Sequence, residues 1–347
     1  MKKLFLLFAL CGIFSCADDT DFVPFNTVSI HNVYADSVSI RAITAVNDST
    51  VWFAGSGGKV GVIEGKTPKL ATIRYQENAL SFRAIAKTEE AVFVLSIANP
   101  GVLYKIGVNG SEATYIEEVY VEEGEKVFYD AMKFWNDQEG LAIGDPIDGC
   151  FSLLITRDGG DSWSKTPCDD LPAVEEGEAF FAASNTNIAV IGNEAWVVSG
   201  GKKARVFKTS DKGKTWSATD TPIIEGAAMT GIYTVAFRDA KNGIVFGGNW
   251  DDKTSNKGNK AITTDGGKSW KLLSDGSGPG YKSCVVYVPN SGGEGLVAVG
   301  STGISHSPDG GLTWATLSSE GYYAIEFVND SIAFASGLNK IDKLRFK

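Results

Sequence analysis

Carboxylates are the side chains of this chain that could carry out acid–base chemistry. Five of them adjoin short apolar runs: Asp130, Asp145, Glu178, Asp251 and Asp252. Two carboxyl groups at a suitable separation can hydrolyse a glycosidic bond, one as the acid and the other as the base or nucleophile. A glycoside hydrolase is therefore one hypothesis for the function.

A second group of side chains suits binding rather than hydrolysis. Arginine forks bind carboxylates, and aromatic rings offer flat apolar contact area. The candidates, besides the carboxylates, are Arg41, Arg83, Arg205, Trp250, Tyr281 and Tyr323. Such a set would hold a polar ligand, a glycan or a protein loop that carries an acid. Alternatively, Arg41 and Arg83 pair with Asp130 or Glu178 and only balance charge.

The composition argues against several other classes. The formal net charge is -10 and no basic cluster occurs, so nucleic acid is not an expected partner. The chain has two histidines and no CxxC pair, so we expect no metal site. The glycine cluster at residues 55–58 follows a strand-like run but opens no helix, so it is no dinucleotide fingerprint. We expect no cofactor.

One eight-residue pattern occurs four times and indicates the elements that position these residues. The pattern is (Ser/Thr)-x-Asp-x-Gly-x-(Ser/Thr)-Trp, and its copies begin at residues 156, 209, 263 and 307. It is the Asp-box, or BNR repeat, in which the carboxylate accepts backbone N–H groups within a turn and the Trp packs over the hairpin. We therefore assign structural roles to its Asp and Trp residues: Asp158, Trp163, Asp211, Trp216, Asp265, Trp270, Asp309 and Trp314.

The spacing of the copies, about 45 to 55 residues, is typical of one blade of a β-propeller. Similar apolar segments upstream and downstream predict an all-β, seven-bladed propeller over residues 26–347. The fourth blade would open with the strand 179–183. The last unit, from residue 322, provides three strands, so we expect the segment 26–33 to complete it and close the ring.

Propeller geometry then predicts where the candidate site lies. The innermost strand of each blade starts at one face, whereas the Asp-box turns lie at the other. The starts of the seven innermost strands would surround the channel mouth with Arg41, Arg83, Asp130, Phe181, Thr234, Cys284 and Tyr323.

The N-terminal residues predict export. Residues 1–15 combine two lysines, an apolar run and a small residue before Cys16, which is typical of a lipoprotein signal peptide. Cys16 would be acylated, and residues 16–25 would form an acidic tether like the tags on surface lipoproteins of Bacteroides-like bacteria. An exported chain can form a disulfide between Cys150 and Cys168, although two separate buried thiols remain the alternative.

Several phrases carry a resemblance to a known family: residues 81–83 (SFR), 128–132 (FYDAM), 144–146 (GDP) and 237–239 (FRD). With the Asp-boxes, they resemble the photosystem II stability and assembly factor-like propellers. That resemblance implies an assembly chaperone that docks to a membrane protein through an arginine-rich face. This chain has only seven arginines and an export signal, so we do not expect a photosynthetic partner.

Taken together, the residues favour a monomeric, non-catalytic binding or assembly scaffold. It would be held by its lipid at the outer membrane or cell surface, with its body in the periplasm or outside the cell. The expected partner is a protein or glycan of the cell envelope. A sialidase is less well supported, because no arginine precedes Ile-Pro or Leu-Pro.

Overall fold

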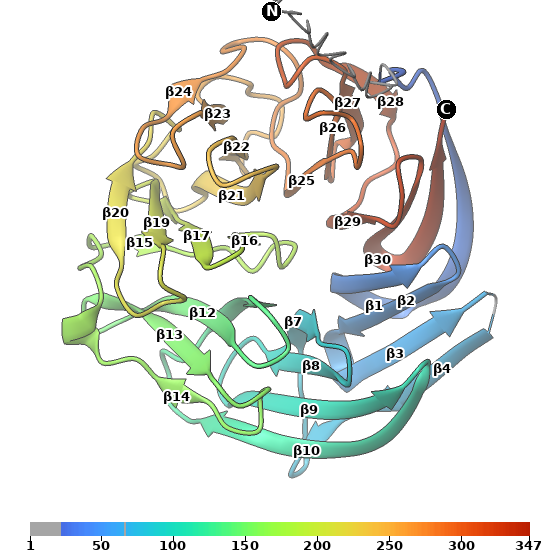
Figure 1. Ribbon diagram of the computed structural model, residues 1–347, viewed down its shortest axis with the longest axis vertical. Helices are drawn as coiled ribbons and strands as arrows, with labels where there is room; N and C mark the ends of the chain where they lie inside the picture. The colour runs from blue at the N-terminus through green and yellow to red at the C-terminus, as the bar shows by residue number, and fades with distance from the viewer. Residues whose placement is uncertain (1–21, 66) are drawn as a thin grey trace, which may run out of the picture.

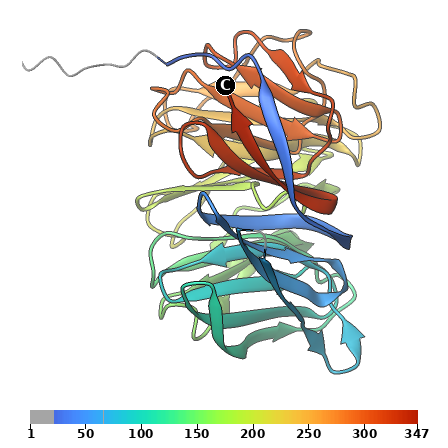
Figure 2. The same cartoon turned by 90° about the vertical axis from the view of Figure 1, so that its right-hand side faces the viewer.

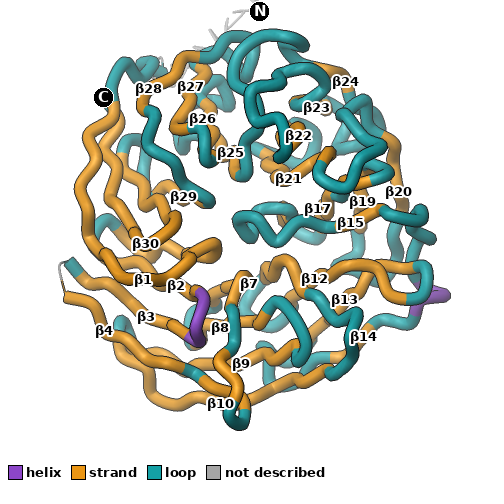
Figure 3. Tube along the Cα trace, turned by 180° about the vertical axis from the view of Figure 1, so that it is seen from behind, coloured by secondary structure: helices purple, strands orange, loops and turns teal. Residues whose placement is uncertain are grey.

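The computed structural model describes residues 22–65 and 67–347. The predicted signal peptide (1–15), Cys16 and residues 17–21 of the tether lie outside the described residues. Antiparallel sheets are arranged in a ring around a common centre (Figure 1). In the described part of the chain, no helix is long and apolar enough to cross a bilayer. Figure 3 shows two short 3-10 helices, η1 (Ser56–Gly58) beside β7 and η2 (Cys168–Asp170) at the outer edge.

Four sheets have four strands each. In spatial order their strands are β10 (Glu112–Glu122), β9 (Gly101–Asn109), β8 (Ala91–Ser96) and β7 (Phe82–Lys87); β11 (Tyr129–Phe134), β12 (Gly140–Ile147), β13 (Cys150–Thr156) and β14 (Ser164–Lys165); β16 (Ile188–Ile191), β17 (Glu194–Val198), β19 (Arg205–Thr209) and β20 (Ser217–Asp220); and β25 (Cys284–Tyr287), β26 (Leu296–Gly300), β27 (Gly303–Ser307) and β28 (Ala315–Ser318).

Two further sheets have six strands each. One contains β29 (Ala324–Phe327), β30 (Ile332–Phe346), β1 (Val28–Asn47), β2 (Thr50–Gly55), β3 (Lys59–Glu64) and β4 (Thr67–Thr72). The other contains β15 (Glu178–Ala179), β18 (Gly200–Gly201), β21 (Thr230–Phe237), β22 (Gly243–Asn249), β23 (Lys260–Thr263) and β24 (Lys271–Leu272). A small two-stranded sheet joins β5 (Arg74–Tyr75) to β6 (Asn78–Ala79).

The described chain thus has six sheets of four or more strands, not the seven blades that the sequence predicted. The difference arises in β1, which runs without a break from the strand expected to complete the last unit into the first strand of the first unit, so that both units belong to one sheet. The first half of β1 pairs with β30, from Val28 opposite Phe346 to Ala35 opposite Lys340. Its second half pairs with β2, with Ile40 opposite Gly55. Figure 2 shows β1 in blue beside β30 in red.

The prediction of a strand over residues 179–183 is wrong for most of that segment. Only Glu178 and Ala179 are in a strand, β15, which belongs to the six-stranded sheet of β21–β24; the innermost strand of the sheet expected to be the fourth blade is β16 (Ile188–Ile191). The residues between them reach toward the centre of the ring (Figure 1). Asn185 binds two sheets there, because its amide nitrogen donates to Ile85 O (2.7 Å) and its amide oxygen accepts from Met132 N (3.0 Å). We call residues 180–187 the central loop.

The four repeats form the same turn. In the second copy, Asp211 Oδ1 accepts from Thr209 Oγ1 (2.8 Å) and from Thr215 N (2.9 Å), while Oδ2 accepts from Thr215 Oγ1 (2.7 Å). Gly213, with φ of 83°, donates its N–H to Thr209 Oγ1. The same bonds recur around Asp158, Asp265 and Asp309. These carboxylates are therefore used within their own turns.

The tryptophans of the repeats pack between neighbouring sheets. Trp163 is 7% exposed and lies edge-on to Phe134, and Trp216 lies edge-on to Phe151. Trp270 contacts Phe237 and Trp314 contacts Phe246 in the same edge-on manner. The apolar clusters of the protein lie between adjacent sheets, so each tryptophan adds to one such contact.

Two further sequence expectations concern the chain ends and the cysteines. Cys150, at the start of β13, and Cys168, in η2, form a disulfide with a Cα–Cα distance of 5.6 Å. Cys168 lies beyond β14 rather than on the strand opposite Cys150. Phe22 and Phe25, assigned to the tether, pack against the sheet of β25–β28, and Phe25 N donates to His306 Nε2 (3.1 Å).

Candidate functional site

A cavity of about 330 Å³ lies beside the central loop. We call it the central pocket. It contains five of the ten predicted ligand-binding residues: Arg41, Arg83, Asp145, Trp250 and Tyr281. The innermost strands β1 and β7 contribute the two arginines, β12 contributes the aspartate, and the segment after β22 contributes the tryptophan. The pocket therefore joins residues that lie more than 200 positions apart in the sequence.

The two arginines meet without a carboxylate partner. Among the described residues neither forms an ion pair within 4 Å; instead Arg41 Nη1 donates to Ala183 O (3.2 Å) and Arg83 Nη1 to Ala182 O (3.4 Å). Arg41 Nε is buried without a hydrogen-bond partner in residues 22–65 and 67–347, and the Arg41 guanidinium lies 3.9 Å from the ring centroid of Tyr323. Burial and the nearby charge of Arg41 lower the pKa of Arg83. An anion placed between them would relieve both costs.

The nearest carboxyl groups do not supply that anion fully. Asp130 is 0% exposed, and within the described residues neither of its oxygens accepts a hydrogen bond. Burial and the charge of Asp145 raise its pKa well above the usual value, which favours the neutral acid. Burial raises the pKa of Asp145 to about 6, although Phe180 N donates to its Oδ1 at 2.8 Å. The pocket is consequently cationic near neutral pH.

An aromatic wall forms the opposite side of the pocket. Phe181 stacks on Tyr233 with centroids 4.0 Å apart, and Tyr281 lies edge-on to both Tyr233 (4.7 Å) and Trp250 (5.2 Å). Lys253 lies over the Trp250 ring, 4.1 Å from its centroid. Flat rings beside two guanidinium groups suit a ligand with an apolar body and an acidic end.

Four predicted site residues do not line the central pocket, and Asp130 is sealed beneath it. Glu178 and Arg205 form a buried ion pair with each other, in which Arg205 Nε donates to Glu178 Oε1 at 3.1 Å and Nη2 also donates to Oε2. This pair fixes a loop rather than facing a ligand. Asp251 is exposed at the loop after β22. The ring of Tyr323 packs against the guanidinium group of Arg41.

The central loop is the part of the site that sequence reasoning missed. Ala182 and Ala183 provide the carbonyls that hold the arginines, and both residues are buried. Their apolar run, 179–183, predicted a strand, because burial produces such a run in a strand and in a packed loop alike. Phe128, noted in the sequence only as part of the phrase 128–132, and Met229 also line the pocket.

The comparisons with known proteins identify a fold. No protein-family profile matches the sequence, and no curated protein matches it either. A structure described as "YCF48 bound to D1 peptide" is 14% identical, with 94% of this chain and 98% of that chain covered and a TM-score of 0.64. YCF48 from Cyanidioschyzon merolae is 13% identical, with 92% and 98% covered and a TM-score of 0.65.

A glycosidase is also similar. The GH74 xyloglucanase from Xanthomonas campestris is 12% identical over 92% of this chain but only 54% of its own, with a TM-score of 0.63. The WD40 repeats of RRP9 match with a TM-score of 0.64 and 10% identity. At such low identities these likenesses concern the fold alone. The chain is an all-β β-propeller.

Proposed function

We propose that this chain is a non-catalytic binding or assembly scaffold whose central pocket takes a protein segment that ends in a free C-terminal carboxylate. One observation carries the proposal: Arg41 and Arg83 converge on one cavity with no ion-pair partner within 4 Å in the described chain. A bidentate carboxylate would supply the missing charge, and the aromatic wall would hold the neighbouring apolar side chain. Binding proteins among the structural neighbours, such as YCF48 bound to D1 peptide, support a protein partner.

The test compares peptides that differ only at the C-terminus. A peptide array carries each sequence twice, as the free acid and as the amide, and is probed with the purified protein. We expect binding of free acids with an aromatic or apolar final residue and a loss of at least about 10-fold in Arg41→Gln and Arg83→Gln. The matched control is Arg74→Gln, because Arg74 is an exposed arginine outside the pocket.

Three results would contradict this function. The amides could bind as well as the acids, or Arg74→Gln could weaken binding as much as the pocket variants. Melting temperatures separate the third: if Arg41→Gln and Arg83→Gln both unfold the protein, the arginines balance internal charge instead. In that case the carboxylate site is wrong.

A glycoside hydrolase or glycan-binding protein is the second candidate, and Asp145 favours it. Its pKa of about 6 suits a general acid, and it shares the pocket with Trp250 and Tyr281, which could stack on a sugar ring. The complete burial of Asp130 argues against a second carboxyl group that reaches the ligand. Release of reducing sugar from a polysaccharide panel, abolished in Asp145→Asn, would favour this candidate over the scaffold.

We also propose that the chain is an exported, monomeric lipoprotein with Cys16 as its acylated end. The support is the signal-like sequence of residues 1–15, the acidic tag after Cys16 and the disulfide between Cys150 and Cys168, which an oxidising compartment permits. Cys16→Ala should leave the protein folded and release it from membranes. If the variant remains in the membrane fraction, the anchor is wrong.

Two finer features of the fold belong to the same proposal. The repeat turns are taken as BNR-type Asp-boxes, on the strength of their sequence pattern and shared hydrogen bonds. The pairing of residues 28–35 with residues 340–346 supports a ring that the N-terminal strand closes. Both features relate the chain to photosystem II assembly factor-like propellers, without a photosynthetic partner.

A further inference from the structure

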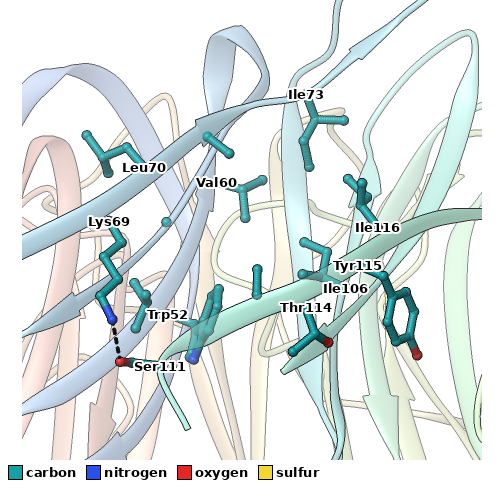
Figure 4. Close-up of a pocket in the computed structure, with 14 residues that line it drawn as sticks. Trp52, Val60, Lys69, Leu70, Ile73, Ile106, Ser111, Thr114, Tyr115 and Ile116 are labelled. Carbon is teal, nitrogen blue, oxygen red and sulfur yellow. Dashed lines mark hydrogen bonds between the residues drawn. The ribbon is translucent and has the colours of Figure 1, made fainter. Parts of the chain in front are cut away.

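A second cavity, apolar and about 350 Å³ in volume, opens at the outer rim between β3–β4 and β9–β10. We call it the rim groove. Figure 4 shows Trp52 and Val60 in its middle, with Lys69 and Leu70 on one side and Tyr115 and Ile116 on the other. Tyr115 and Ile116 are 49% and 51% exposed, although both are large and apolar. β4 and β10 are the outermost strands of their sheets, so no further strand of those sheets covers the groove.

Elsewhere in the ring, Asp-box turns occupy the corresponding place. The turn that follows β23 lies against β17 of the preceding sheet, where Trp196 Nε1 donates to Gly266 O at 2.9 Å. A Cβ added at Gly267 would lie 3.1 Å from the Trp196 indole. The turn that follows β13 approaches Phe93 of β8 in the same way, since a Cβ at Gly160 would overlap that ring. These two turns thus cover an aromatic residue on the second strand of the preceding sheet, whereas Gly213 of the turn after β19 lies against Ile155 and Trp135 and Gly311 of the turn after β27 lies against aliphatic side chains.

In the sheet that contains β1–β4, Trp52 on β2 is the residue that such a turn would cover. Like Trp196, it lies on a second strand and is buried, at 3% exposure. The next sheet, however, has no Asp-box. The pairing of the strands shows which residue replaces the start of the box. Phe93 lies opposite Lys105 and Trp196 lies opposite Lys208, so Lys105 and Lys208 are equivalent positions. The residue after Lys105 is Ile106, whereas the residue after Lys208 is Thr209, the first residue of an Asp-box. Ile106 has no hydroxyl to start the turn, and β9 simply continues to Asn109.

The consequence is an unmet hydrogen bond. Trp52 Nε1 is buried without a hydrogen-bond partner in the described residues, whereas Trp196 Nε1 bonds to the carbonyl of its covering turn. An unmade bond of this kind costs free energy, and an incoming carbonyl would recover it. The rim groove therefore has the shape, the apolar floor and the missing acceptor of an Asp-box site whose turn the chain does not provide.

The charge around the groove indicates what accompanies that turn. Lys69 is already engaged, because it donates to Ser111 Oγ (2.9 Å) and lies 3.7 Å from Glu64 and 3.9 Å from Glu112. Glu118 is exposed on β10 and forms no ion pair within 4 Å among the described residues. The open rim thus carries surplus negative charge, which suits a partner with lysine or arginine next to its aromatic residue.

We propose that the rim groove binds a turn of a partner protein that inserts a tryptophan side chain between the two sheets. The main-chain carbonyl of that turn accepts from Trp52 Nε1, and a basic residue beside it faces Glu118. The partner completes the ring's series of Asp-box contacts from outside. This site is separate from the central pocket and does not depend on the function proposed for it.

The test uses the chain's own turn as the probe. A synthetic peptide with the sequence of residues 262–271, ITTDGGKSWK, contains the turn that covers Trp196 and has a lysine on each side of its tryptophan. The chain has eight tryptophans, so eight indole N–H resonances are followed by NMR, and the Trp52 resonance is assigned from its loss in Trp52→Phe. We expect this resonance to shift as the peptide is raised to about 1 mM.

Two variants and one control peptide make the result specific. Trp52→Phe keeps an apolar ring but removes the donor, so its affinity for the peptide, measured by calorimetry because the variant lacks the Trp52 resonance, should fall about 3- to 10-fold. Ile116→Ser removes exposed apolar contact at the groove wall and should weaken binding without touching the core. The peptide with alanine in place of its tryptophan should not bind. Trp135→Phe, in the turn after β11, should bind as the natural protein does.

The proposal fails if saturating peptide leaves the Trp52 resonance unchanged. It also fails if both Trp52→Phe and Ile116→Ser bind as tightly as the natural protein, or if only the Trp250 resonance of the central pocket moves. A Trp52 shift that depends on protein concentration without peptide would assign the groove to a second copy of this chain. That outcome overturns the foreign partner.

Discussion

Replacing Arg205 with methionine removes the cation bonded to a fully buried carboxylate. The Glu178 side chain is 0% exposed and Arg205 is 11% exposed. Glu178 also accepts from Ser199 Oγ (2.5 Å) and from Glu175 N (3.0 Å), and Arg205 Nη2 donates to Ala173 O (2.9 Å). Methionine fills a similar volume, so the variant chiefly tests the lost charge and its hydrogen bonds rather than a cavity.

The expected loss is large because a buried charge is left without its partner. Breaking a buried pair in this way costs about 3–5 kcal/mol of unfolding free energy. For about 325 folded residues the entropy of unfolding is about 0.7 kcal/mol per degree, so the melting temperature should fall by about 4–7 °C. Differential scanning calorimetry measures the shift. The double variant Glu178→Gln/Arg205→Met should recover at least half of it, because no net charge then remains buried.

The opposite pattern would refute this reasoning. If Arg205→Met melts within about 1 °C of the natural protein but loses a peptide or glycan ligand, then Arg205 faces a ligand, as the sequence first suggested. If the double variant is no more stable than the single one, the cost comes from lost packing of the arginine stem instead.

Three further predictions concern other parts of the fold. Cys150→Ser should lower the free energy of unfolding by about 3 kcal/mol, and intact-mass analysis of the unreduced protein should find no reactive thiol at Cys150 or Cys168. The neutral ring of His306 accepts a hydrogen bond from Phe25 N, and burial lowers the pKa of this ring below 6.5. The unfolded chain therefore binds the proton more readily than the folded protein does. Stability measured by urea unfolding should fall as the pH drops below about 6.5 in the natural protein but not in His306→Gln. Trp163→Ala should lower the free energy of unfolding in urea by about 3–5 kcal/mol. Trp163→Phe removes an indole N–H that is buried without a partner among the described residues, and it should cost less than half as much. Equal losses in the two variants would contradict the packing role.

The repeat pattern predicted much of the local structure because its residues interact within eight positions. Thr209, Asp211 and Thr215 form their bonds inside one turn, so the residue types alone indicate the geometry. The apolar second strands, such as Thr50–Gly55, were equally visible, since a strand buried on both faces reads as a continuous apolar run. The convergence of Arg41 and Arg83 followed from placing such strands around a ring.

The missed features depend on contacts between distant segments. Nothing near residues 180–183 reveals that their carbonyls meet arginines about 100 and 140 positions earlier in the chain. The pairing of Glu178 with Arg205 likewise needs two loops to meet, and either residue alone reads as a surface charge. The unbroken course of β1 through two pairing partners is hidden, because alternating residues predict a strand but not which neighbour each half will have.

The pairing of β1 with β30 imposes an order on events during synthesis. Most hairpins of this fold join residues fewer than about 30 positions apart, so they can form soon after they emerge. Val28, in contrast, must wait for Phe346, and Ala35 for Lys340. Until then the first half of β1 is an open strand edge, able to pair with other chains. Quality-control factors that protect such edges would therefore have to act longest on the N-terminal end of this chain, and a truncation that removes residues 340–347 should cause aggregation rather than a simple loss of stability.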